Sequence, residues 1–179
     1  MKSIAVYCGA SHGVSARYAD AARAMGAALV ERGLALVYGG GNVGLMGVIA
    51  DEVLRLGGMV YGVIPRALMA REVGHAGLTE LFVVEDMHER KAMMARLADA
   101  FIAMPGGMGT LEELFEMLTW SQLGIHDKPV GVLNVDGYYD ALVGFIGHAR
   151  GEGFIAERHA ALMMVEAQPD ALLERLLAH

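Results

Sequence analysis

Short runs of apolar residues alternate with longer segments of helical periodicity along the 179-residue chain. Residues 4–7 and 101–104 are continuously apolar, which is typical of strands that are buried on both faces of a parallel sheet. Strands are expected at residues 3–10, 34–40, 59–65, 81–85, 100–104 and 129–135, with helices between them. This order predicts one α/β domain over residues 1–179, a doubly wound parallel sheet with helices on both faces.

Composition and charge narrow the possible environments and partners. Apolar residues make up 55% of the chain and the mean hydropathy is +0.40, so we expect part of the apolar surface to be buried between subunits. No apolar stretch reaches the roughly 20 residues that span a bilayer, and the chain begins directly with the first predicted strand. The net charge of −7 disfavours nucleic-acid binding. We therefore expect a cytoplasmic protein without membrane or nucleic-acid partners.

The only cysteine is Cys8, which lies at the end of the first predicted strand. It has no second cysteine with which to form an intramolecular disulfide. Its position in an apolar run favours a small buried apolar residue over a nucleophile.

A first glycine-rich turn, residues 39–47, follows the second predicted strand and opens a helix that extends to about Leu56. Free N–H groups at such a turn favour an anion, and five glycines in nine residues exceed what a tight turn alone requires, so we expect Gly40, Gly41 and Gly44 to contact phosphate. The turn also satisfies G-x-G-x-x-G. Dinucleotide binding is disfavoured because the next strand, residues 59–65, has no acidic residue to hold the ribose.

A second glycine-rich turn, residues 104–109, joins the fifth predicted strand to a helix. Thr110 and Glu113 have the spacing of a capping box, which would make Thr110 the N-cap of that helix. A cap does not explain the three preceding glycines, Gly106, Gly107 and Gly109. We expect these glycines and Thr110 to bind phosphate.

Two linked motifs carry a family resemblance. Residues 105–113 match P-G-G-x-G-T-x-x-E, and residues 87–91 match M-H-x-R-K. Together with Cys-Gly-Ala-Ser at 8–11, the turn at 39–47 and Thr-Trp at 119–120, they make most of the chain resemble the LOG (Lonely Guy) proteins. These are cytokinin riboside 5′-monophosphate phosphoribohydrolases that are often mislabelled lysine decarboxylases.

The resemblance implies a Rossmann-like fold, a homodimer with active sites near the subunit interface, and no metal or other cofactor. It also implies hydrolysis of nucleoside 5′-monophosphates, with Arg90 and Glu113 as the catalytic pair. The chemistry agrees, because cleavage of an N-glycosidic bond develops positive charge on the ribose, by analogy with glycoside hydrolysis. Glu113 would stabilise that charge or activate water, and the Arg90 guanidinium would hold phosphate or ribose oxygens. Without the motif, Arg90 would be interpreted as a solvated helix charge.

Three other polar residues are candidates with competing interpretations. Ser11 would either hydrogen-bond the nucleotide or cap the next helix. His88 would donate a proton to the leaving base or simply be solvated. Lys91 would be a ligand or a surface residue. Residues 66–79, which include Arg66, Arg71 and His75, are long enough to form a lid over the ligand.

The helix after the second glycine turn is apolar around most of its circumference, which predicts burial on most sides and suits a dimer interface. The thirteen methionines are more typical of core filling than of a binding groove.

Two other function classes remain open. A pyridoxal-phosphate decarboxylase would need a lysine, and only Lys2, Lys91 and Lys128 exist, none on a cofactor motif. The second class is a non-catalytic nucleotide or cofactor carrier of related fold. The motifs do not distinguish prenylated from plain adenine as the preferred base.

Overall fold

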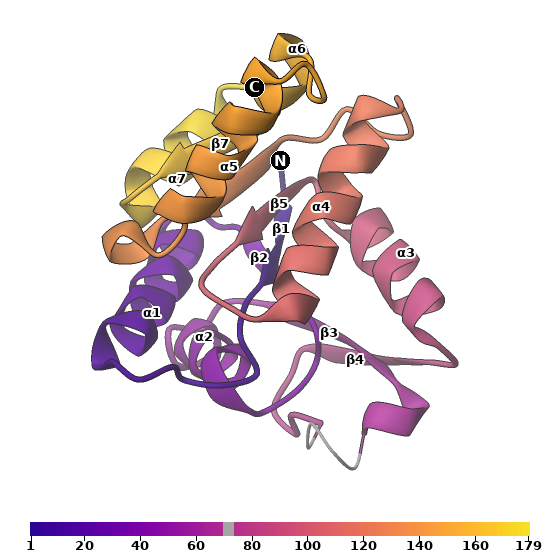
Figure 1. Cartoon of the computed structure of the whole chain (residues 1–179). Helices are drawn as coiled ribbons and strands as arrows, with labels where there is room; N and C mark the ends of the chain where they lie inside the picture. Colours follow the sequence, from indigo (N-terminus) through magenta and orange to yellow (C-terminus); the bar gives the residue numbers. More distant parts are fainter. Residues whose placement is uncertain (70–73) are drawn as a thin grey trace.

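Seven parallel strands form one sheet in the order β4-β3-β2-β1-β5-β6-β7 in the computed structural model, which describes residues 1–69 and 74–179 (Figure 1). All described strand pairs are parallel. The strands are β1 (Ser3–Tyr7), β2 (Ala35–Tyr38), β3 (Val60–Pro65), β4 (Glu80–Val84), β5 (Ala100–Ala103), β6 (Val130–Leu133) and β7 (Met163–Glu166).

Helices cover both faces of the sheet, which confirms the doubly wound Rossmann-like α/β fold. One core contains α1 (Ala16–Glu31), α2 (Gly44–Arg55) and α7 (Pro169–Leu177). The opposite core contains α3 (Met87–Leu97) and α4 (Met108–Gln122). Along β1, Ile4 and Val6 belong to the first core, and Ala5 and Tyr7 belong to the second. Burial of alternate residues on opposite faces explains why residues 4–7 do not alternate between apolar and polar.

The six predicted strands are confirmed: five are shorter than the predicted ranges, and β4 has the predicted length but begins one residue earlier. β7 was not predicted. It is an edge strand whose four residues are only half-buried, and its sequence Met-Met-Val-Glu contains one β-branched residue. Such a segment lacks the signal that identified the central strands.

The topological switch point lies between β1 and β5, where the strand order reverses. In such sheets ligands bind at the carboxyl edge near this point. Here the loops after three strands are joined by backbone hydrogen bonds: Gly9 N–H donates to Pro105 O over 3.0 Å, and Leu45 N–H donates to Gly9 O over 2.9 Å. The loop after β1 therefore fixes both glycine turns in place.

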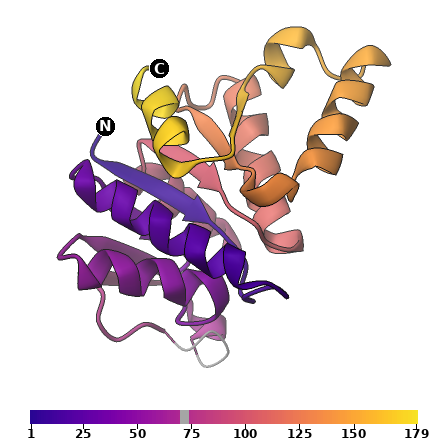
Figure 2. The same cartoon turned by 90° about the vertical axis from the view of Figure 1, so that its left-hand side faces the viewer.

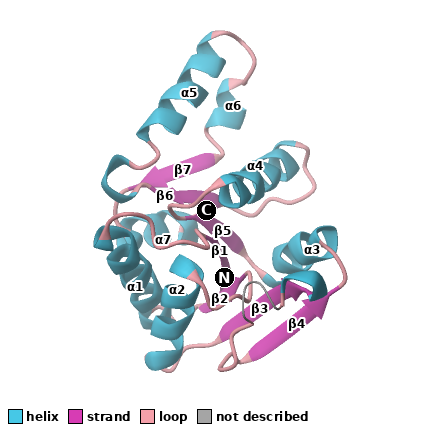
Figure 3. Cartoon of the chain, turned by 60° about the horizontal axis from the view of Figure 1, so that its bottom comes forward, coloured by secondary structure: helices cyan, strands magenta, loops and turns pink. Residues whose placement is uncertain are grey.

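Two helices stand apart from the body of the fold. Figures 2 and 3 show α5 (Asp140–Gly151) and α6 (Glu157–Ala160) extending beyond the β7 edge of the sheet. Neither helix contains a buried residue. Short 3-10 helices, η1 (Arg66–Leu68) and η2 (Val135–Gly137), follow β3 and β6. Within the described ranges no helix is both long and apolar enough to cross a membrane.

Replacing Gly44 by alanine should destabilise the fold. Gly44 has a φ of +56°, and a Cβ there would lie 2.3 Å from the Ser11 nitrogen and from the Ala10 carbonyl carbon. Because both obstacles are backbone atoms, we expect Gly44→Ala to lower the free energy of unfolding by roughly 2 kcal/mol or more, measured by urea denaturation. In contrast, a Cβ at Gly151 would have no atom within 4 Å, so Gly151→Ala should change the free energy of unfolding little. Equal midpoints for the two variants would contradict this account.

Candidate active site

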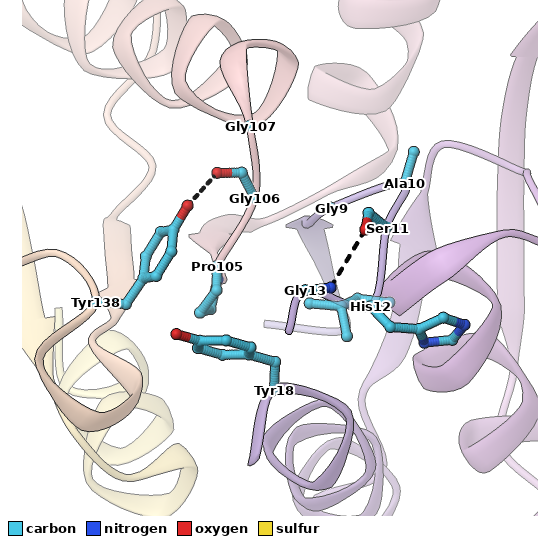
Figure 4. A pocket seen from close by; sticks show the side chains of 11 residues that line it. Gly9, Ala10, Ser11, His12, Gly13, Tyr18, Pro105, Gly106, Gly107 and Tyr138 are labelled. Carbon is cyan, nitrogen blue, oxygen red and sulfur yellow. Dashed lines mark hydrogen bonds between the residues drawn. The ribbon is translucent and has the colours of Figure 1, made fainter. Parts of the chain in front are cut away.

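Two adjoining cavities open at the carboxyl edge of the sheet and share Gly9, Ala10 and Gly107. The first, which we call the tyrosine cavity, has a volume of about 400 Å³ and is lined by Ser11, Tyr18 and Tyr138 among others (Figure 4). The second, which we call the glutamate cavity, has a volume of about 310 Å³. Its polar lining includes Arg90, Thr110, Glu112 and Glu113. The predicted catalytic pair therefore lies in one cavity.

Arg90 is held rigidly although it carries a charge. It lies in the first turns of α3, which Asp86 caps by accepting a hydrogen bond from Glu89 N. Its side chain is buried, with the residue only 5% exposed, and Nε donates to Val63 O over 3.0 Å while Nη2 donates to Gly39 O over 2.7 Å. A Cβ on Gly39 would lie 2.2 Å from Nη2. The absence of a side chain at Gly39 thus creates the space for the guanidinium.

Those two bonds refine the expected role of Arg90. Two of its N–H groups donate to backbone carbonyls, Gly39 O just after β2 and Val63 O within β3. These two N–H groups are therefore already used and do not bind substrate oxygens. A buried cation is stable only when it is hydrogen-bonded, and these carbonyls meet that requirement. Arg90 therefore presents a fixed positive charge to the glutamate cavity.

Glu113 lies on α4, half-buried, one helical turn beyond Thr110. Its charge affects the buried groups at the end of β1. Burial raises the pKa of the Tyr7 phenol well above its ordinary value, and the negative charge of Glu113 raises it further. Burial and then Glu113 likewise raise the pKa of the Cys8 thiol. Cys8 therefore stays a protonated thiol at neutral pH, as expected for a buried apolar residue and not for a nucleophile.

Lys91 is neither a surface residue nor part of a cavity wall. It is buried, and its Nζ lies 2.6 Å from Glu112 Oε1 and 3.1 Å from Glu116 Oε2. Burial by itself lowers the pKa of Lys91, but hydrogen bonds to Glu112 and Glu116 outweigh it and raise the pKa above its ordinary value. A raised lysine pKa means that the ammonium is fully charged at neutral pH. Lys91 thus joins α3 to α4 beside the catalytic pair.

The predicted capping box is wrong. Helix α4 begins at Met108, three residues earlier than expected, with Gly107 as N-cap and no side-chain capping bond. Thr110 is the third helical residue and is buried, and its Oγ1 would lie 2.1 Å from a Cβ on Gly106. The hydroxyl packs under the turn because Gly106 has no side chain. The glycines let the helix start earlier than the threonine pattern predicts.

The residues predicted to bind phosphate do not all gather in one place. Ser11, Gly106 and Gly107 line the tyrosine cavity, and Gly107, Gly109 and Thr110 line the glutamate cavity. Ser11 does not cap α1, because the N-cap is Ser15, whose hydroxyl accepts a hydrogen bond from Arg17 N. The Ser11 hydroxyl instead accepts a hydrogen bond from Gly13 N over 3.3 Å at the cavity wall (Figure 4).

The glycines of the first turn that were predicted to bind phosphate, Gly40, Gly41 and Gly44, line neither cavity. Gly40 packs against β3, with a φ of +75°, and Gly41 forms a bridge with Gly74. Gly44 packs on the Ala10–Ser11 peptide. The turn contributes Leu45 to the tyrosine cavity and Met46 to the glutamate cavity. His88, the predicted proton donor, is exposed on α3 and lines neither cavity.

The predicted lid is described only in part, because Arg71 lies outside the described residues. His75 N–H donates to Gly40 O over 3.1 Å, and its Nε2 lies 3.0 Å from Asp51 Oδ1. Arg66 pairs with Glu85 over 3.3 Å. Leu68 lines the glutamate cavity. Closure over a ligand stays a prediction.

Several site residues were not found from the sequence. Tyr18 and Tyr138 form the aromatic wall of the tyrosine cavity, with ring centroids 5.7 Å apart in an edge-to-face arrangement. Tyr138 follows a predicted strand at the carboxyl edge, which is the signal that could have singled it out. Glu112 and Glu116 are four residues apart on α4, but only the fold shows that they flank Lys91.

Lysine-based cofactor chemistry has little support in the geometry. Lys91 is bound by two carboxylates, and Lys128 Nζ donates to Ala95 O and Ala98 O, each over 2.7 Å. Lys2 lies at the opposite, amino end of the sheet, next to β1. None of the three lysines lines either cavity. In the part of the chain that the structure describes, no group of three His, Cys, Asp or Glu residues is arranged to hold a metal ion.

Arg90→Lys should destabilise the protein, because one ammonium cannot reproduce the planar geometry that serves Val63 O and Gly39 O. We expect the free energy of unfolding to fall by roughly 2–4 kcal/mol, from the penalty for leaving buried carbonyls unsatisfied, as measured by urea denaturation. Arg96→Lys, on the exposed side of α3, is the matched control and should stay within about 0.5 kcal/mol of the native protein. A urea midpoint for Arg90→Lys equal to that of the native protein would show that the hydrogen bonds to Val63 O and Gly39 O do not contribute to stability.

Structural neighbours share the fold. A molybdenum cofactor carrier protein from Chlamydomonas reinhardtii has a TM-score of 0.74 and 21% identity, and the alignment covers 99% of each chain. The molybdenum cofactor binding protein from Rippkaea orientalis has a TM-score of 0.72 and 20% identity, covering 99% of this chain and 96% of that one. At such low identity these structures establish the fold alone.

Sequence relatives are closer. A family model described as "Possible lysine decarboxylase" matches residues 46–176. A protein of Oryza sativa subsp. japonica named "Probable cytokinin riboside 5'-monophosphate phosphoribohydrolase LOGL1" is 61% identical over 152 residues, which cover 85% of this chain and 68% of the relative. "Cytokinin riboside 5'-monophosphate phosphoribohydrolase LOG1" of Arabidopsis thaliana is 51% identical over 175 residues, which cover 98% of this chain and 82% of the relative. The family model and these identities show that the chain belongs to the LOG family of phosphoribohydrolases, a family of hydrolytic enzymes.

Proposed function

We propose that this enzyme hydrolyses the N-glycosidic bond of cytokinin riboside 5′-monophosphates, and of AMP, to an adenine-type base and ribose 5-phosphate. The observation that carries the proposal is the presence of Glu113 and Arg90 in one cavity that begins at the amino end of α4. The names of the sequence relatives supply the substrate class. The proposal also includes AMP, whose adenine base carries no N6 substituent.

The proposed orientation of the nucleotide follows from the chemistry of the cavity walls. The 5′-phosphate binds at the turn of Gly106 to Thr110, because the first N–H groups of α4 lack intrahelical acceptors and the helix dipole favours an anion there. The ribose then lies one helical turn further on, beside Glu113. The base lies against the apolar part of the glutamate cavity, formed by Met46, Leu68 and Met87.

In the proposed reaction, water forms a bond to C1′ while the bond from C1′ to the base nitrogen breaks. The bonding electron pair leaves with the base, and one proton of the water ends on the base. Positive charge that develops on the ribose is stabilised by the Glu113 carboxylate, which also orients the water. Arg90 presents its fixed positive charge to the same cavity and aligns oxygens of the sugar. His88 has no part in this scheme, because its side chain is exposed away from both cavities.

Glu113→Gln should abolish turnover while leaving the fold and nucleotide binding intact, because the amide keeps the shape of the side chain but loses its charge. We expect base release from AMP and from N6-isopentenyl-AMP, followed by chromatography, to fall roughly 100- to 1000-fold. Binding of AMP, followed by calorimetry, should persist. Glu174→Gln, exposed on α7, should retain native turnover.

The rival function is a non-catalytic nucleotide or cofactor carrier, which the fold of the cofactor carrier proteins favours. The same assay separates the two. Binding of AMP without release of base by the native protein would establish the carrier. Native turnover by Glu113→Gln would instead remove Glu113 from the chemistry.

We further propose that the enzyme is a homodimer whose interface includes α5 and the neighbouring end of α4. Phe145 on α5 is 61% exposed, and Leu123 after α4 is 65% exposed. A hollow of about 190 Å³ between α4, α5 and α6 is lined by apolar side chains such as Phe115 and Ile146. Helix α4 is thus not buried on most sides within one chain, in contrast to the sequence-based expectation. A second copy of the same chain would cover these residues.

Phe145→Glu should convert the dimer to a monomer, because a charge would be buried against an apolar surface. Light scattering after size exclusion should give twice 19.1 kDa for the native protein and a single chain mass for the variant. Leu56→Glu, a partly exposed residue after α2 on the opposite face, is the control and should stay dimeric. A native protein that elutes as a monomer would refute the proposal.

A further inference from the structure

The turn between β5 and α4 is held by three successive carbonyl groups. Met104 O accepts a hydrogen bond from the Tyr139 hydroxyl over 2.7 Å. Pro105 O accepts one from Gly9 N over 3.0 Å. Gly106 O accepts one from the Tyr138 hydroxyl over 2.6 Å (Figure 4). Two adjacent tyrosines thus donate to carbonyls two residues apart, those of Met104 and Gly106, on either side of Pro105.

The segment that carries the two tyrosines is itself anchored. Asn134 Oδ1 accepts a hydrogen bond from Tyr139 N over 2.7 Å, and Asn134 Nδ2 donates to Asp140 Oδ1 over 2.7 Å. Asp136, at a φ of +50°, pairs with Arg17 of α1. The rings also support one another, because the centroids of Tyr138 and Tyr139 are 4.9 Å apart in an edge-to-face arrangement. The hydroxyl of Tyr138 is therefore a fixed donor.

The bond to Gly106 O determines where the Gly107 N–H points. The two groups belong to one planar trans peptide, so they point in opposite directions. A peptide between two glycines has no Cβ on either side to restrict its rotation, and an ideal Cβ on Gly107 would meet no atom within 4 Å. Without the Tyr138 hydroxyl, this peptide has little to hold it in one orientation.

We propose that Tyr138 is a positioning residue for recognition of the substrate phosphate. Its hydroxyl turns the Gly106–Gly107 peptide so that the Gly107 N–H faces the space shared by the two cavities, where the 5′-phosphate binds. The inference rests on the proposed function for the location of the phosphate. It predicts a defect that depends on the phosphate, since the tyrosine touches neither ribose nor base.

Tyr138→Phe tests this, because it removes the hydroxyl and keeps the ring. Binding of ribose 5-phosphate, AMP and adenosine is measured by calorimetry, with thermal unfolding followed in parallel. We expect affinity for ribose 5-phosphate and for AMP to fall by the same factor, roughly 10-fold, and affinity for adenosine to stay unchanged. In turnover assays KM for AMP should rise by that factor with kcat nearly unchanged, as for the loss of uniform binding.

Tyr61→Phe is the matched control, since the Tyr61 hydroxyl on β3 lies 3.7 Å from Met59 Sδ and Tyr61 lines neither cavity, and all three affinities should stay native. Unchanged affinity for ribose 5-phosphate in Tyr138→Phe would overturn the inference. An equal loss for adenosine would also overturn it, because a general structural role has no preference for phosphate. These results leave the proposed function intact if the native protein releases base. Failure of the native protein to bind AMP or ribose 5-phosphate would instead remove the proposed function together with this inference.

Discussion

The geometry of the site depends on one buried cation, the guanidinium of Arg90. A charge in the interior needs hydrogen-bond partners, and Arg90 donates to Val63 O within β3 and to Gly39 O just after the neighbouring strand β2. This requirement explains both the glycine at position 39 and the close approach of α3 to the sheet. Because α4 packs on the same face, Glu113 is brought to the same cavity. Backbone atoms thus fix the guanidinium of Arg90 at the wall that it shares with Glu113.

The two glycine turns have the same sequence character but different physical roles. In the first turn, Gly39 makes room for Arg90 and Gly44 makes room for the loop after β1, so the glycines serve close packing. In the second turn, Gly106 accommodates Thr110, while Gly107 and Gly109 have no neighbour that a Cβ would meet. Open space at these two positions, at the start of α4, is what an anion needs. Glycine content alone does not separate packing from binding, because both need the absence of a side chain.

The sequence was most informative where a local pattern has a single structural solution. Continuous apolar runs predicted the central strands because both of their faces are buried, whereas the half-buried β7 gave no such signal. The motifs predicted that Arg90 and Glu113 act together, and the fold brings them into one cavity. The capping pattern at Thr110 failed because the preceding glycines allow an earlier helix start. The contacts of Lys91 and Tyr138 join segments 21 and 32 residues apart, so they follow from strand order and not from local sequence.

The likeness to cofactor carriers shows why the fold does not identify the reaction. A doubly wound sheet offers a phosphate-sized space at the switch point whatever the protein then does with its ligand. The hydrolysis that we propose needs one further group, a carboxylate one helical turn beyond the turn at residues 106–110, and Glu113 has that position. Its place on α4 is secured from two sides, by the early start of the helix at the glycine turn and by Lys91, which binds Glu112 and Glu116 on either side of it. In the proposed reaction, the same helix therefore supplies the amide donors for the phosphate and the charge for the cationic transition state, and its rigidity fixes the spacing between them.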